Sequence, residues 1–277
     1  MAGTEYGSSV QLGPQDAPAC LALSDEANWN QTEDDWRFFL SHGSVFGIRE
    51  KAGRLVATAA LLPYTASAAW ISMVLVTADW RRRGLATSLL DDCLALAKAN
   101  GLTTWLDATP AGARVYGPLG FTPTLSIQRL GHEGSGAHAV PASEPAPTGA
   151  LDDIAARDQR AMGFDRTALL RELSARPGSR LVSRDSALGL VRDGRKARHI
   201  GPLFADGPED ALALVTDVVR SEPGALLIDA VDSRDGLLRG LTEFGWTVER
   251  PFQRMRFGIT TMKAATPPMA GAGPEFG

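Results

Sequence analysis

Apolar and polar residues in the first 130 positions follow the two periods that a mixed α/β fold requires. Runs of apolar, often β-branched residues predict strands at residues 10–12, 45–50, 54–64, 69–76, 104–107 and 121–130. Apolar residues at helical spacing predict helices at residues 18–27, 33–41, 86–100 and 111–119. Thr32 is suited to cap the second helix. This order predicts a three-layer α/β domain, a mixed twisted sheet flanked by helices.

The second half of the chain repeats features of the first half in the same order. The matched positions are residues 29–32 with 164–167, Gly43 with Gly178, 106–108 with 228–230, and 120–121 with 245–246. One such match could arise by chance, but four in the same order indicate an internal repeat. We therefore expect two tandem α/β domains of the same class.

Composition suggests where the two domains end. Residues 131–150 and 263–277 are rich in small residues and proline and hold few large apolar side chains. The first stretch is expected to be a flexible linker and the second a disordered tail. The expected domains are then residues 1–130 and 151–262, and 277 residues suffice for two cores.

The most informative local pattern is the turn W-R-R-R-G-L-A-T at residues 80–87, between a predicted strand and a predicted helix. Backbone N–H groups at a helix start have no intrahelical acceptor and, with the helix dipole, form an anion site. A glycine lets the backbone approach a ligand closely. The alternative is a solvated basic first turn, which the dipole disfavours. The turn therefore predicts a site for a phosphate-bearing cofactor.

The spacing Arg81-x-x-Gly84-x-Ala86 after a strand resembles the acetyl-CoA signature of the GNAT family of N-acetyltransferases, Q/R-x-x-G-x-G/A. The resemblance implies that backbone amides of the turn hold the CoA pyrophosphate and that the preceding strand hydrogen-bonds the pantetheine arm. It also implies an N–H of Leu75 or Val76 as donor to the acetyl oxygen. The implied cofactor contacts are Val74, Leu75, Val76, Arg81, Arg82, Arg83, Gly84, Leu85, Ala86, Thr87 and Thr109.

A second segment, residues 116–121, resembles the family pattern Y-x-x-L-G-F. The resemblance places Tyr116 beside the CoA sulfur, where its phenol can donate a proton to the departing thiolate. The alternative is a half-buried aromatic side chain that packs its helix. Thr109 stands where many family members carry an asparagine, which puts that pantetheine contact in doubt.

Transfer to an amine also needs a group that accepts a proton. Asp107, at the end of a predicted strand, is the first choice for this base, although it could instead cap the helix that begins near Pro110. Glu26 and Asp229 are further candidates. In this fold the loop before residue 33 borders the acceptor site, but it could equally be a hydrophobic staple and N-cap. The expected acceptor-binding residues are Glu26, Trp29, Asn30, Gln31 and Asp229.

The second repeat lacks the signature. At the corresponding place, residues 208–213 read P-E-D-A-L-A, with no glycine and two carboxylates that would repel a pyrophosphate. We predict that the second domain does not bind CoA. It is expected to cover the first domain's active site, to form a dimer, or to shape the acceptor pocket.

Composition excludes several other classes. The chain is 44% hydrophobic and 22% charged with a net charge of −4, typical of soluble globular proteins and without the basic surface of a nucleic-acid binder. No apolar run approaches the roughly 18 residues of a membrane span, and residues 1–10 do not resemble a signal peptide, so we expect a cytoplasmic protein. Two cysteines and four scattered histidines predict neither a disulfide framework nor a metal site.

These patterns favour an enzyme that moves an acetyl group from acetyl-CoA to a primary amine of a small molecule or amino-acid derivative. No cysteine lies in the motif, so direct attack in a ternary complex is expected rather than an acyl-enzyme. The alternative is an acyl-CoA sensor or interaction module that has lost turnover. A nucleotide ligand is disfavoured because Leu85, and not a Walker-type lysine, follows Gly84.

Overall fold

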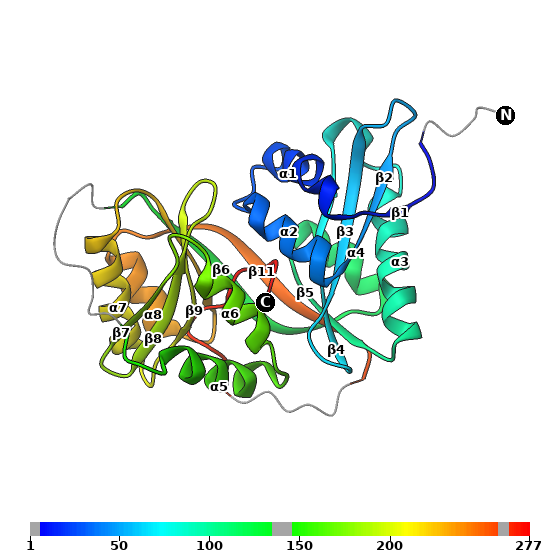
Figure 1. Ribbon diagram of the computed structural model, residues 1–277. Coiled ribbons are helices and arrows are strands. Elements are labelled where there is room, and N and C mark those ends of the chain that lie inside the picture. Colours follow the sequence, from blue (N-terminus) through cyan, green and yellow to red (C-terminus); the bar gives the residue numbers. More distant parts are fainter. Residues whose placement is uncertain (1–5, 135–145, 260–265) are drawn as a thin grey trace. The chain divides into compact units, whose positions relative to one another are not determined.

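The computed structural model describes residues 6–134, 146–259 and 266–277 (Figure 1). It divides into two compact units, Met1–Leu106 and Asp107–Gly277, which are described separately below. In the described part of the chain, no helix combines the length and the apolar character that crossing a membrane requires.

Unit 1 is a mixed sheet with helices on it. The strands β1 (Val10–Gln11), β2 (Ser44–Arg49), β3 (Leu55–Pro63) and β4 (Ala68–Val76) pair antiparallel in succession, and β4 runs parallel to β5 (Thr103–Ala108). Helices α1 (Ala17–Glu26) and α2 (Glu33–His42) contact β3, and α3 (Leu85–Ala99) contacts β2, β3 and β4 (Figure 1). The predicted fold class is confirmed.

The start of α2 shows how local sequence sets an element. Thr32 Oγ1 accepts a hydrogen bond from Asp35 N–H at 3.2 Å, and Asp35 Oδ2 accepts one from Thr32 N–H at 2.7 Å. This reciprocal pair satisfies two donors at the helix start, so the predicted cap is confirmed. The next turn buries Trp36 and Phe39 completely, which fixes α2 on the unit 1 core.

Unit 2 contains one sheet in the order β11-β6-β10-β9-β8-β7. Its elements are α4 (Pro110–Tyr116), β6 (Thr122–His132), α5 (Ala150–Met162), α6 (Thr167–Ala175), β7 (Arg180–Arg184), β8 (Ala187–Arg192), β9 (Arg198–Phe204), α7 (Pro208–Ser221), β10 (Leu226–Val231), α8 (Asp235–Glu243) and β11 (Thr247–Phe257). Leu203 packs with residues of α7 and α8, whereas its neighbour Phe204 packs with α5. Since successive strand residues point to opposite faces, helices cover both faces of this sheet.

The sequence led us to expect that β6 closes the sheet of the first half, and this expectation is wrong. The strand lies between β10 and β11, with Leu130 opposite Ile228 and Ile127 opposite Phe252. Ile127 and Leu130 are fully buried there. The segment between the two elements is shorter than the expected linker 131–150, because β6 continues to His132 and α5 begins at Ala150. Residues 135–145 of the expected linker lie outside the described part of the chain.

The internal repeat extends further than the sequence comparison indicated. Gln128-Arg129 stands at the same spacing after Gly120 as Gln253-Arg254 after Gly245. Each arginine bonds the aspartate of the other repeat: Arg129 pairs with Asp229, and Arg254 pairs with Asp107. The repeats therefore exchange their ion-pair partners.

The expectation of a disordered tail at 263–277 is wrong for the residues that the structure describes, 266–277. Met269 N–H donates to Leu203 O at 2.8 Å and Leu203 N–H donates to Ala270 O at 3.0 Å, while Val231 N–H donates to Met269 O at 3.1 Å. The segment thus fills the gap between β9 and β10, and Met269, Ala270 and Phe276 are buried. Small residues are needed there because the backbones approach closely: a Cβ on Gly201 would lie 2.0 Å from Gly271 O.

Candidate active site

The end of β4 is bulged and separated from β5. The two strands pair only from Ala68–Thr103 to Trp70–Trp105, after which β4 continues to Val76. Opposite β3 the register shifts between Thr58 and Ala60, and Met73 adopts φ of +53°. Thr58 Oγ1 donates to Met73 O at 2.9 Å and holds the bulge. A bulge redirects backbone N–H groups out of the ladder, which suits the predicted contacts of residues 74–76 with an extended ligand.

The helix α3 begins without a side-chain cap. Its N-cap, Gly84, has φ of +80°, a conformation that favours glycine, and apart from its neighbours along the chain no atom lies within 4 Å of where its Cβ would be. Ser88 N–H bonds Gly84 O at 3.0 Å. The preceding N–H groups, those of Leu85, Ala86 and Thr87, come before the first intrahelical hydrogen bond and have no acceptor within the helix.

The three arginines of the turn are exposed, and nearby groups hold Arg81 and Arg83 in place. Arg81 Nε donates to Val76 O at 3.0 Å, which ties the turn to the end of β4. Arg83 lies over the Trp80 ring at 4.6 Å, and Arg82 adopts φ of +61°. The positive charge of the three arginines therefore stands beside the uncapped end of α3, and the predicted contact with a pyrophosphate stays a prediction.

Two carboxylates border this turn, and both are engaged. Asp79 accepts a hydrogen bond from Arg54 at 2.7 Å, and this bond lowers the pKa of Asp79. Glu26, at the end of α1, accepts hydrogen bonds through Oε1 from Thr77 Oγ1 at 3.0 Å and from Ala78 N–H at 2.6 Å. Glu26 therefore holds the start of the turn, next to the end of β4.

The loop between α1 and α2 contains the other expected acceptor-binding residues of unit 1. Trp29 is half-buried, and Asn30 and Gln31 are buried. Gln31 Oε1 is buried and has no hydrogen-bond partner in the described part of the chain. Thr32 caps α2, so the N-cap part of the alternative interpretation is confirmed, while Gln31 retains an acceptor oxygen for a ligand.

Thr109 and Tyr116 stand at the two ends of α4 in unit 2. Thr109 Oγ1 accepts a hydrogen bond from Gly112 N–H at 3.2 Å, so Thr109 is the N-cap of this helix. Tyr116 is half-buried, with its ring centroid 5.8 Å from that of Phe121. The packing described as the alternative for Tyr116 is present, and its proposed contact with the cofactor sulfur stays a prediction.

Comparison with known families decides the assignment. Residues 16–121 match the "Acetyltransferase (GNAT) family" and residues 154–267 match the "Acetyltransferase (GNAT) domain". The chain belongs to the GNAT acetyltransferase family. It carries two GNAT domains in tandem.

Solved structures share this GNAT fold over nearly the whole chain. A candidate acetyltransferase from Pyrococcus horikoshii has a TM-score of 0.79 and 19% identity, with 99% of this chain and 97% of that chain covered. A GCN5-related N-acetyltransferase from Sphaerobacter thermophilus has a TM-score of 0.64, 16% identity, and coverage of 95% and 100%. A tandem GNAT protein from the clavulanic acid biosynthesis pathway has a TM-score of 0.63, 17% identity, and coverage of 92% and 100%. No curated protein sequence matches the chain.

Within this GNAT protein, Asp107 is engaged by Arg254. Arg254 Nε and Nη2 donate to Asp107 Oδ1 and Oδ2, each at 2.9 Å, and 2% of the Asp107 side chain is exposed. Burial raises the pKa of the Asp107 carboxyl, and the Arg254 guanidinium opposes that rise. With both oxygens occupied, the geometry favours a structural ion pair over the expected base. Nor does Asp107 cap α4, because Thr109 does.

The expected acceptor contact of Asp229 is not supported either. Arg129 donates two hydrogen bonds to its carboxylate, each at 2.8 Å, and His199 Nε2 lies 2.9 Å from Oδ2. Burial alone would raise the pKa of Asp229, but Arg129 and His199 overcome it and hold that pKa well below its ordinary range. Asp229 is 2% exposed. Its contacts with Arg129 and His199 link β10 to β6 and to β9.

The second GNAT domain has the same bulge with different chemistry. The register of β9 against β8 shifts between Gly189 and Val191, at Gly201-Pro202. By register Pro202 corresponds to Val74, and proline has no N–H to offer a ligand. The gap beyond the bulge is filled by residues 269–271. These observations support the prediction that the second domain does not bind CoA.

No group of three or more His, Cys, Asp or Glu side chains placed to hold a metal ion occurs among residues 6–134, 146–259 and 266–277.

Proposed function

We propose that this protein is an N-acetyltransferase that uses acetyl-CoA and acts on a primary amine of a small molecule or amino-acid derivative. The observation that carries the proposal is the uncapped start of α3 at Gly84, beside three exposed arginines and directly after a bulged, separated β4. A pyrophosphate fits that helix end by charge and by its free N–H donors.

The residues present suit the cofactor. Leu85, Ala86 and Thr87 would hold the pyrophosphate through backbone N–H groups, and residues 74–76 of β4 would hold the pantetheine. Bound there, acetyl-CoA supplies an activated acetyl thioester. The N–H of Leu75 or Val76 would donate to the acetyl oxygen, which stabilises negative charge as the amine attacks.

Proton transfer is assigned to Tyr116 and to a carboxylate outside the buried ion pairs. Tyr116 is proposed as the donor to the departing thiolate. Asp107 and Asp229 are held in bidentate ion pairs, so Glu26 is the candidate base with an oxygen not engaged in the described part of the chain. Gln31 Oε1 is proposed to accept a hydrogen bond from the amine substrate.

A matched pair of glycine variants tests the cofactor site. Gly84 and Gly53 both have positive φ and open space at the Cβ position, but Gly53 lies in the β2–β3 turn. Gly84→Glu should abolish acetyl-CoA binding in titration calorimetry, whereas Gly53→Glu should leave it unchanged. Equal affinity of the two variants would refute the site.

Turnover separates the enzyme from a sensor. Release of CoA in the presence of a panel of small amines supports the transferase. Tight acetyl-CoA binding without CoA release on any amine would support instead the non-catalytic acyl-CoA sensor, since a shared fold alone does not establish activity.

A further inference from the structure

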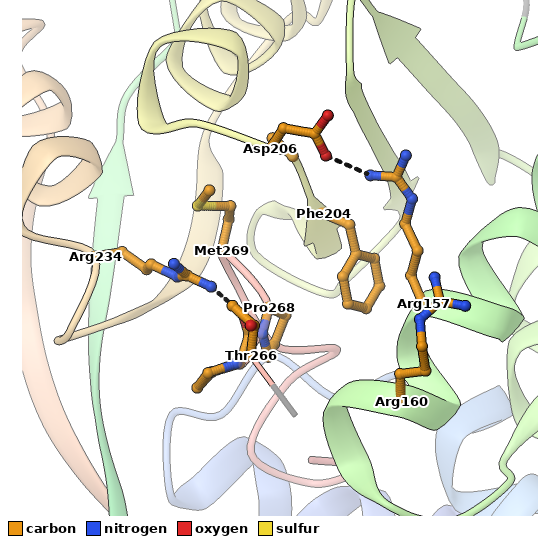
Figure 2. Close-up of a pocket in the computed structure, with 10 residues that line it drawn as sticks. Arg157, Arg160, Phe204, Asp206, Arg234, Thr266, Pro268 and Met269 are labelled. Carbon is orange, nitrogen blue, oxygen red and sulfur yellow. Dashed lines mark hydrogen bonds and ion pairs between the residues drawn. The ribbon is translucent and has the colours of Figure 1, made fainter. Parts of the chain in front are cut away.

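Unit 2 contains a cavity of about 470 Å³ beside the segment that fills the gap between β9 and β10. Its walls are Arg157 and Arg160 of α5, residues 204–206 at the end of β9, Arg234, and residues 266–269. Figure 2 shows Arg234 on one side of this space and Arg157 and Arg160 on the other, with Phe204 between them. We call these three side chains the pocket arginines.

The pocket arginines are only partly neutralised by carboxylates. Among the described residues, Asp206 is the one acidic residue that lines the cavity; its carboxylate lies 3.9 Å from the Arg157 guanidinium, and its side chain is 82% exposed. Arg160 has no ion-pair partner in the described part of the chain. Arg234 donates to a backbone oxygen, that of Pro267, and its Nε has no acceptor among the described residues.

The pocket arginines are half-buried (Arg157 and Arg234) or exposed (Arg160), whereas the fully buried arginines of unit 2 lie elsewhere. Each is matched by a carboxylate: Arg129 by Asp229, Arg166 by Asp158, Arg192 by Glu275 and Arg254 by Asp107. Three guanidinium groups around one cavity repel one another unless an anion lies among them. The excess positive charge around the cavity favours an anionic ligand.

Part of the remaining lining is apolar. Phe204, Pro268 and Met269 form a wall next to the charged groups. A cavity of this size, with an apolar wall and a few polar groups, suits a small organic molecule. Guanidinium groups hold phosphate or carboxylate through paired N–H donors.

The geometry points to a binding site in the second domain for a small organic anion, with its phosphate or carboxylate among the pocket arginines and its apolar body against Phe204 and Met269. The ligand is not CoA, because the chain itself fills the gap between β9 and β10 where a pantetheine arm would lie. The site is separate from the cofactor turn at Gly84 and does not depend on the proposed function.

Titration calorimetry on the full chain tests this site with two probes, phenyl phosphate and inorganic phosphate. Phenyl phosphate should bind with one site per chain and at least tenfold more tightly than inorganic phosphate. Arg160→Glu should weaken phenyl phosphate binding at least tenfold. The matched control is Arg171→Glu, which makes the same charge change on an exposed arginine of α6 outside the cavity and should bind as the unmodified chain does.

A second comparison separates this site from the cofactor turn. Phenyl phosphate should still bind Gly84→Glu, and acetyl-CoA should still bind Arg160→Glu. The inference is overturned if phenyl phosphate fails to bind, if Arg160→Glu and Arg171→Glu bind it equally, or if Gly84→Glu abolishes its binding.

Discussion

Arg254 on β11 binds both carboxylate oxygens of Asp107, with two N–O distances of 2.9 Å. The two residues stand 147 positions apart in the sequence and are almost fully buried. A bidentate pair in such surroundings is costly to break from one side, because the remaining charge stays buried without a partner.

Removing both partners of this pair should therefore destabilise unit 2 by less than the summed effects of removing each one alone. Arg254→Met or Asp107→Leu alone should lower the free energy of unfolding by about 3–5 kcal/mol. The double variant should lose less than the sum of the two, as measured by denaturant unfolding in a double-mutant cycle. Additive losses would contradict a direct pairing.

Acid should destabilise the protein in two steps. The pKa of His199 is lowered by burial, against the hydrogen bond of Asp229, so the unfolded chain takes up a proton near pH 6.5 before the folded one does. The stability that neutral His199 provides is full above pH 6.5 and declines below it. The pKa of Asp229 is also lowered in the fold, so its contribution is full above about pH 4 and is lost as the pH falls further. Unfolding free energy measured from pH 8 to 3 checks both steps.

The variant His199→Gln isolates the first step. It should be less stable at pH 8, and its stability should change little between pH 6.5 and 5, where no imidazole is left to titrate at this position. An unchanged slope in that range would show that another group causes the decline.

Gly201→Ala should disturb the packing of residues 269–271. The new Cβ would meet Gly271 O at 2.0 Å, so a strand or the packed segment must move. Gly224→Ala is the control, since Gly224 also has positive φ but, apart from its chain neighbours, no atom within 4 Å of its Cβ position. Thermal unfolding should show Gly201→Ala to be less stable than the control by about 1–3 kcal/mol, the usual cost of overpacking. Equal stability would mean that this contact is easily relieved.

Tyr116→Phe should lower turnover while leaving acetyl-CoA affinity within about twofold. Loss of a general acid commonly costs about 10²-fold or more in rate. The ring packing against Phe121 does not need the hydroxyl, so the fold should be kept. Steady-state kinetics and calorimetry check the two parts, and full activity would exclude the acid role.

Local signals in the sequence were sufficient for much of this structure. Thr32 begins α2 and Gly84 begins α3 because each satisfies a backbone requirement within a few residues. What the sequence could not show is which distant group each charge meets. Asp107 and Asp229 have the spacing of site residues, yet their partners lie on β11 and β6. These partners are 147 and 100 positions away in the sequence, and pairing over such separations produces no periodic pattern along the chain.

The expectation of a disordered tail at residues 263–277 failed for a physical reason as well. Ala, Gly and Pro in residues 266–277 resemble the composition of a disordered segment. Here the small residues allow the backbone of the segment to lie close to the neighbouring strands. The buried Arg166 and Arg192 donate hydrogen bonds to carbonyl groups of the segment. Composition alone does not distinguish a chain without a core from one that fits into a narrow gap.

The position of β6 has a consequence for how such a chain can change over generations. This strand comes from the first repeat but lies between two strands of the second, where it is joined to β10 by the Arg129–Asp229 pair. Deleting the second repeat would leave β6 without either of these neighbours. The second domain can therefore lose its own cofactor signature and still be retained by selection, because the first repeat depends on it to place its last strand.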